Sequence, residues 1–142
     1  AELKNKFQRY FGKVGSNVAN KLQGSLPAIS LSVHTSFNTA FINDVDAMLN
    51  YAQQVIGYAK PEDIIIGIST SGNSKNVYYA FMAAKVKDTK SIAICGKDGG
   101  MLSSIADCCL IVPAYETYLI QEYHLAIYHF ICAYVESEMF ER

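Results

Sequence analysis

A run of β-branched residues that ends in a hydroxyl-rich turn constrains the fold of this chain more than any other feature. Residues 64–68 read Ile-Ile-Ile-Gly-Ile, which is typical of a parallel strand covered on both faces. Four hydroxyl groups follow within six residues, on Ser69, Thr70, Ser71 and Ser74. Gly72 permits backbone conformations that a side chain would disfavour. The pattern therefore predicts a strand, a tight turn and a helix that begins near Ser74.

A turn of this kind can bind a phosphate group. The helix predicted over residues 74–87 points its free N–H groups and the positive end of its dipole at the turn, and an anion is stabilised there. The alternative is that Ser74 only caps the helix. The turn is not a Walker loop, because it lacks a Gly-Lys-Ser/Thr ending. It is not a dinucleotide-binding loop either, because the three spaced glycines are missing.

Composition excludes several classes of protein. The 142 residues are enough for one domain with one core. The formal net charge is −1 and the basic residues are not clustered, so we expect no nucleic-acid partner. The four cysteines show neither a CxxC pair nor zinc-finger spacing, which predicts reduced thiols in the cytoplasm. The most apolar stretch, residues 118–135, is interrupted by polar side chains, so we expect no membrane partner.

Predicted strands and helices alternate along the chain. We expect strands over residues 28–33, 64–68, 91–95 and 108–112. We expect helices over residues 2–11, 44–58, 74–87, 101–106 and 117–138, and loops over residues 12–25, 34–43 and 96–100. This alternation implies an α/β fold, with a parallel sheet between two layers of helices. Ligands of such sheets bind beyond the carboxyl ends of the strands, where the hydroxyl-rich turn lies.

Several short motifs follow one another in a characteristic order. The first two are Leu-Pro-Ala-Ile at residues 26–29 and Asn-Asp at 43–44. Ser-Thr-Ser-Gly-Asn-Ser at 69–74, Gly-Lys-Asp-Gly-Gly at 96–100, and Ile-Gln-Glu-Tyr-His-Leu at 120–125 with His129 come next. Together they resemble the sugar isomerase (SIS) domain family, and within it the phosphoheptose isomerases. The resemblance implies a three-layer α/β/α sandwich of the flavodoxin-like SIS type, with a five-stranded parallel sheet in the intact protein. We expect residues 1–142 to form a single SIS domain whose N-terminal part precedes Ala1.

The resemblance also implies an activity. Members of this family isomerise phosphorylated sugars, here most simply sedoheptulose 7-phosphate to D-glycero-D-manno-heptose 7-phosphate, for lipopolysaccharide or related glycans. Such an aldose–ketose isomerisation passes through an enediol and needs proton-transferring groups and an anchor for the phosphate. The resemblance assigns the anchor to Ser69, Thr70, Ser71 and Ser74. It assigns a sugar contact to Asp44, which could also be a helix N-cap.

The last helix offers the candidates for proton transfer. At about 100° per residue, Glu122 and His129 lie on nearly one stripe, with Gln121 at its edge, and His124 points about 140° away from His129. Geometry therefore favours His129 as the partner of Gln121, although a histidine in a packed helix interface would fit the pattern too. The resemblance assigns catalysis to His129 and Glu2, assigns substrate orientation to Gln121, and leaves His124 structural.

Zinc and self-association are further implications of the resemblance. Glu2, Gln121 and His129 match three of the four positions with which some family members bind zinc, and the fourth lies before Ala1. Since zinc prefers four ligands, it is a candidate cofactor and not a required one. The resemblance also implies a homotetramer with sites at subunit interfaces, in keeping with the apolar residues that surround the last helix.

Two alternatives stay open. Close isomerases tend to carry Asp or Ala, then Arg, where Tyr118 and Leu119 stand, and this difference favours an isomerase of another phosphosugar. The other alternative is a non-catalytic SIS module that binds a phosphosugar or the replication initiator protein. The presence of both Glu2 and His129 counts against that second alternative.

Overall fold

The chain folds into two compact units. The computed structural model describes residues 2–140; one unit ends at Ile29 and the other starts at Ser30. The first unit contains α1 (Glu2–Lys21), which bends at Gly12, where φ is 55°. A β-carbon on Gly15 would clash with the carbonyl oxygen of Phe7, so the two halves of α1 pack closely. A helix was predicted only as far as residue 11, because the glycines read as a loop.

The second unit is built on a parallel sheet. Its strands are β1 (Ile64–Ser69), β2 (Lys90–Cys95) and β3 (Cys108–Ile111). The order is β1-β2-β3, and both pairs are parallel. In register, Ser69 is paired with Cys95 and Cys95 with Ile111, so the three carboxyl ends share one edge. The predicted α/β class with a parallel sheet is confirmed, and the three strands lie close to their predicted positions.

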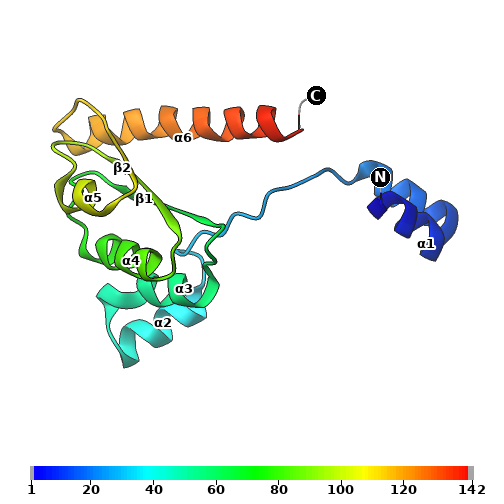
Figure 1. Cartoon of the computed structure of the whole chain (residues 1–142), viewed down its shortest axis with the longest axis horizontal. Coiled ribbons are helices and arrows are strands. Elements are labelled where there is room, and N and C mark those ends of the chain that lie inside the picture. The colour runs from blue at the N-terminus through cyan, green and yellow to red at the C-terminus, as the bar shows by residue number, and fades with distance from the viewer. Residues whose placement is uncertain (1, 141–142) are drawn as a thin grey trace. The chain divides into compact units, whose positions relative to one another are not determined.

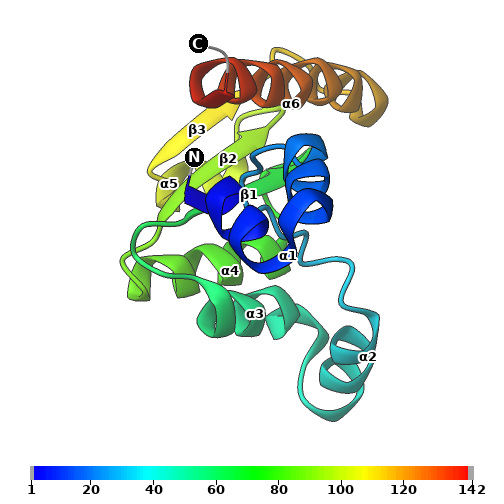
Figure 2. The same cartoon turned by 90° about the vertical axis from the view of Figure 1, so that its right-hand side faces the viewer.

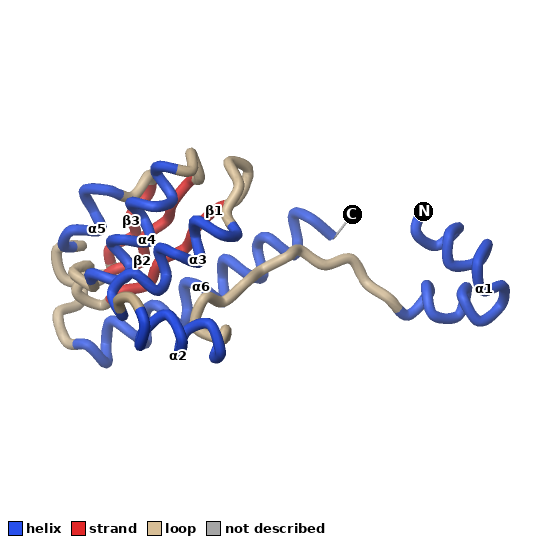
Figure 3. The backbone as a smooth tube through the Cα atoms, turned by 90° about the horizontal axis from the view of Figure 1, so that it is seen from below, coloured by secondary structure: helices blue, strands red, loops and turns tan. Residues whose placement is uncertain are grey.

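Helices cover both faces of this sheet. They are α4 (Lys75–Val86), α5 (Gly100–Ile105) and α6 (Thr117–Phe140), and a further helix is α3 (Asn50–Tyr58). The sheet lies between α4 and α6, as Figures 1 and 2 show, and α3 packs against α4 (Figure 3). Phe81 of α4 and Leu102 of α5 are fully buried against Ala93 and Cys95 of β2. Burying a side chain such as Phe81 stabilises the fold by about 1.5–3 kcal/mol.

The strand predicted over residues 28–33 is wrong. This segment is irregular, and two of its backbone carbonyls are bonded to side chains and not to a neighbouring strand. The Gln54 amide donates to the carbonyl of Leu31 at 3.0 Å, and the Asn38 amide donates to that of Ser32 at 3.2 Å. The side chain of Leu31 packs against the core between α3 and α4. An apolar run after a proline thus serves as an anchored connection.

The loop predicted over residues 34–43 is also wrong. It forms α2 (Thr35–Asp44), and the helix expected over 44–58 instead begins with a 3₁₀ turn at Ala47–Leu49. The Asp46 carboxylate accepts a hydrogen bond from the N–H of Met48 at 2.7 Å and caps this turn. The cap starts the helical segment at Ala47, three residues later than predicted, and the pattern read as one helix covers this turn and α3. Within residues 2–140, no helix has the length and hydropathy needed to cross a membrane.

Candidate functional site

The loop at residues 69–74 connects β1 to α4 at the carboxyl edge of the sheet. The hydroxyl oxygens of Ser69 and Ser74 are 2.9 Å apart, and Ser69 is only 5% exposed. Ser74 is the residue before α4, yet its side chain caps no backbone N–H of the helix. The simple capping role considered for Ser74 is therefore not seen, because its hydroxyl is bonded to Ser69 instead.

The N-terminus of α4 has free hydrogen-bond donors. No acceptor among residues 2–140 pairs with the backbone N–H of Lys75 or of Asn76, while the N–H of Val77 donates to the Asn76 side chain at 3.0 Å. α4 has 12 residues and begins directly after the loop. The positive end of its dipole, at the N-terminus, therefore faces the loop. Free N–H groups at the start of a helix, beside hydroxyl groups, can bind an anion.

A second loop, residues 96–100, lies against the first. The N–H of Gly96 donates to the carbonyl of Thr70 at 3.2 Å. Gly99 and Gly100 have φ of 81° and 49°, in the left-handed region that favours glycine. Lys97 also lies in that region, with φ of 56°, although it carries a side chain. The tight turn predicted for residues 96–100 is confirmed, and the contact between the two loops was not predicted.

The histidines of α6 have opposite environments. His129 is exposed, and its ring centroid is 5.2 Å from that of Tyr128. His124 is 2% exposed, and neither of its ring nitrogens has a hydrogen-bond partner within residues 2–140. Gln121 and Glu122 are exposed. A ligand could therefore reach Gln121 and His129 from outside this unit, whereas His124 is enclosed.

The remaining predicted site residues are Glu2, in the first unit, and Asp44, on α2. Glu2 is exposed on α1, where the Lys6 ammonium lies 2.6 Å from its carboxylate. Glu2 belongs to the first unit and His129 to the second, so the proton-transfer pair stays a prediction. Asp44 is the exposed last residue of α2 and caps no helix, and its contact with sugar also stays a prediction.

The residues expected to bind zinc do not form a complete ligand set in either unit. Within residues 2–140, no three His, Cys, Asp or Glu side chains are grouped so that they could hold a metal ion. Gln121 and His129 are eight residues apart on one helix, which separates their backbones by about 12 Å along its axis. The donors present in the second unit therefore do not fit zinc by themselves.

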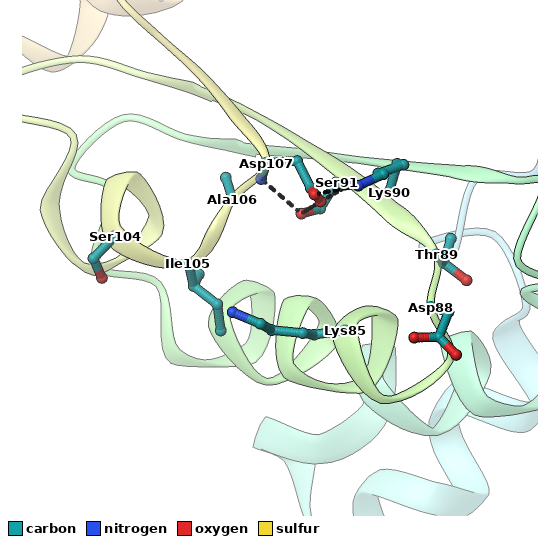
Figure 4. Close-up of a pocket in the computed structure, with 9 residues that line it drawn as sticks. All are labelled: Lys85, Asp88, Thr89, Lys90, Ser91, Ser104, Ile105, Ala106 and Asp107. Atoms are coloured by element: carbon teal, nitrogen blue, oxygen red, sulfur yellow. Dashed lines mark hydrogen bonds and ion pairs between the residues drawn. The ribbon is translucent and has the colours of Figure 1, made fainter.

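A separate cavity of about 470 Å³ lies at the amino edge of the sheet, between the ends of α4 and α5 (Figure 4). The Lys90 ammonium lies 3.0 Å from the Asp107 carboxylate, which also accepts hydrogen bonds from the N–H and hydroxyl of Ser91. The pKa of Asp107 is lowered to about 2 by the hydrogen bond from Lys90 first and those from Ser91 next. Lys85 and Asp88 add one charge of each sign, so the cavity selects neither anions nor cations.

Comparison with known proteins identifies relatives that match most of this chain. Residues 34–135 match the model of the SIS domain family. The chain is 46% identical over 117 residues to the phosphoheptose isomerase of a Nitratiruptor species, covering 82% of this chain and 63% of that protein. It is 47% identical over 116 residues to the phosphoheptose isomerase of Citrifermentans bemidjiense, covering 82% of this chain and 60% of that protein.

Solved structures agree with these sequence matches. The phosphoheptose isomerase from Neisseria gonorrhoeae superimposes with a TM-score of 0.78 at 38% identity, covering 80% of this chain and 63% of that one. A phosphoheptose isomerase from Francisella tularensis gives a TM-score of 0.76 at 34% identity, and the match covers 78% of this chain and 60% of that one. The chain thus spans less than two thirds of the length of these relatives.

Proposed function

Because the chain belongs to the SIS domain family, we propose that its protein is a phosphosugar aldose–ketose isomerase that converts sedoheptulose 7-phosphate to D-glycero-D-manno-heptose 7-phosphate. The observation that carries the proposal is the loop at residues 69–74, which places hydroxyl groups beside free N–H groups at the start of α4. The relatives named phosphoheptose isomerase support the choice of sugar.

The loop would bind the phosphate of the sugar. The Ser69 and Ser74 hydroxyls share a hydrogen bond, so one proton of that pair stays free to donate to the phosphate oxygens. The hydroxyls of Thr70 and Ser71 and the N–H groups of Lys75 and Asn76 would donate to them too. The phosphate lies at the far end of the sugar from the reacting carbons. Its binding energy would therefore hold the reacting end in place without taking part in the chemistry.

Glu2 and His129 would transfer the protons. One of them removes a proton from the hydroxymethyl carbon beside the ketone, which gives an enediol, and the proton is returned to the former carbonyl carbon. The other moves a proton between the two oxygens, so that the ketone becomes a hydroxyl and the alcohol an aldehyde. Gln121 would orient the sugar oxygens. A histidine suits this exchange because its ordinary pKa lies near neutrality.

Self-association would complete the site. Leu125, Phe130 and Val135 of α6 are 49%, 68% and 37% exposed, which is more apolar surface than one helix of a monomer usually presents to water. We propose that α6 packs between copies in a cytoplasmic homotetramer with sites at subunit interfaces. The proton transfers described here do not require zinc. Whether zinc affects turnover is therefore tested separately, in one arm of the experiment below.

Turnover of sedoheptulose 7-phosphate by the protein that carries this chain tests the proposal, beside the variants His129→Ala and Glu2→Gln. We expect turnover by the parent, loss of at least about a hundredfold in each variant, and unchanged binding of phosphate. Zinc and a chelator are added in parallel. Phosphosugar binding without turnover by the parent would instead indicate a sensor module or an isomerase of another sugar, and assays with other ketose phosphates separate these two.

A further inference from the structure

We propose that Asn73 is a positioning residue that clamps the phosphate loop (residues 69–74) to the loop at residues 96–100. This inference rests on the proposed function, since it concerns the shape of the same anion site. Asn73 does not itself need to contact the phosphate. It fixes where the hydroxyl groups and the N-terminus of α4 point.

Three hydrogen bonds of Asn73 shape the phosphate loop and join it to the start of α5, directly after residues 96–100. Its side-chain Nδ2 donates to the carbonyl of Ser71 at 3.0 Å, and its backbone N–H donates to the hydroxyl of Ser71 at 3.2 Å. Its Oδ1 accepts from the N–H of Met101 at 3.0 Å, across 28 residues of sequence. One amide thus shapes the phosphate loop from within and ties it to the first turn of α5.

Two glycines allow the loops to approach so closely. A β-carbon on Gly72 would clash with the carbonyl oxygen of Gly99, and one on Gly100 would lie 2.6 Å from the Asn73 side chain. The N–H of Leu102, which is fully buried, donates to the carbonyl of Gly72 at 3.0 Å. The clamp is therefore a close-packed contact with no room for water or a ligand between its parts.

The clamp also distinguishes the two helices that begin at this edge. The N–H groups of Met101 and Leu102, in the first turn of α5, are taken by Asn73 and Gly72. Those of Lys75 and Asn76 at the start of α4 have no acceptor among residues 2–140. The contact thus uses the donors of α5 to fix the loop and leaves the donors of α4 for the anion.

Titration of the full protein with inorganic phosphate tests the clamp, with Asn73→Ala and Gly72→Ala as the variants. Each is expected to weaken phosphate binding about tenfold, the effect of about 1.4 kcal/mol. The double variant should bind phosphate about as well as the weaker-binding of the two single variants. The two effects should not add, because both changes break the same contact between the loops. Ser104→Ala is the control, since this exposed serine of α5 donates only to the carbonyl of Met101. It should bind phosphate as the parent does.

A second readout separates positioning from general stability. With the phosphorylated sugar as substrate, Asn73→Ala should raise KM about tenfold and lower kcat less, because the residues proposed to transfer protons are untouched. Binding of phosphate by Asn73→Ala within twofold of the parent would overturn the clamp and leave the proposed function standing. A parent protein that binds no phosphate would overturn the phosphate loop itself. If Gly72→Ala fails to fold, Asn73→Ala decides the result alone.

Discussion

The hydroxyl oxygens of Ser69 and Ser74 lie 2.9 Å apart and join the last residue of β1 to the residue before α4. Both hydroxyl groups are therefore held in place before any ligand arrives. Because Ser74 is bonded to Ser69, it does not cap α4, and the helix keeps donors for an anion. If the loop binds phosphate as proposed, this pair of hydroxyls is already in place in the unliganded protein.

Ser69→Ala is expected to weaken phosphate binding more than Ser74→Ala does. Removing the Ser69 hydroxyl frees the side chain of Ser74 to cap α4 and to compete with the phosphate for the same N–H groups. Ser69→Ala should also lower the free energy of unfolding by about 1 kcal/mol, because a partly buried hydrogen bond is lost. Phosphate titration and urea unfolding measure the two effects. Weaker binding by Ser74→Ala than by Ser69→Ala would contradict this account.

The stability of the fold should depend on the volume of the side chain at His124 and hardly at all on the side chain at His129. His124→Leu is expected to leave the free energy of unfolding unchanged or higher, because it replaces a buried imidazole that has no partner within residues 2–140. His124→Ala should cost about 2–4 kcal/mol through the cavity it leaves. His129→Leu should change stability by less than about 0.5 kcal/mol, since the side chain is exposed.

Urea unfolding and turnover measured on the same samples distinguish these outcomes. His129→Leu should be folded and inactive, whereas His124→Leu should be folded and keep at least part of its turnover. A loss of more than about 1 kcal/mol in His124→Leu would mean that the imidazole is hydrogen bonded in the intact protein.

The sequence predicts those parts of the fold that depend on local pattern. The strand at residues 64–68 and the hydroxyl turn after it were identified, because a β-branched run and a tight turn are encoded within a few residues. The strand expected at residues 28–33 was wrong, because strand formation needs a partner and this segment is bonded to Gln54 instead. The Asn73 contact was missed for a related reason: its partner Met101 is distant in sequence and donates through its backbone, which carries no sequence signal.

Acid should destabilise the protein through Asp107. In the folded state the pKa of Asp107 is about 2, below the ordinary 3.8, because Lys90 and Ser91 donate hydrogen bonds to the carboxylate. Because the folded pKa is lowered, the ionised carboxylate contributes to the free energy of unfolding above about pH 4. This contribution is lost as the pH falls toward 2. Asp107→Asn should remove that part of the acid dependence.

The unfolding midpoint in urea, measured from pH 7 down to pH 2.5, tests this. The matched control is Glu62→Gln, at an exposed carboxylate with no bonded partner among the described residues. If the urea midpoints of the parent and of Asp107→Asn fall in parallel as the pH is lowered, Asp107 does not contribute to the acid dependence of stability.

Asp88→Gly is expected to stabilise the protein by about 0.5–1 kcal/mol. Asp88 follows the C-terminus of α4 with φ of 55°, a left-handed conformation that costs energy for any residue with a side chain. Its N–H donates to the carbonyl of Lys85 and the N–H of Thr89 to that of Ala84, the hydrogen bonds of a Schellman motif. Asp88→Ala keeps the strain and serves as the control. Equal unfolding free energies for the Gly and Ala variants would contradict the assignment.

The four thiols should differ sharply in their reactivity. Burial, with a smaller contribution from Cys109, raises the pKa of Cys95 to about 12, and burial also raises the pKa of Cys109. Cys108 and Cys132 are exposed. Because only the thiolate is nucleophilic, iodoacetamide at pH 8 should modify Cys108 and leave Cys95 intact until urea is added. Mass spectrometry of the digested protein locates the modified residues.

The same burial gives Cys95 a predictable effect on alkaline stability. In the unfolded chain its thiol ionises near pH 9, whereas the folded state keeps it protonated until about pH 12. Because the folded pKa is raised, the contribution of the protonated Cys95 thiol to the free energy of unfolding is present in full below pH 9. It is lost as the pH rises toward 12. Cys95→Ala should flatten the fall in unfolding free energy across this range, while Cys132→Ala, at an exposed thiol, should not. Alkylation of Cys95 in the native protein at pH 8 would show that the sheet opens around β2 and would contradict both expectations.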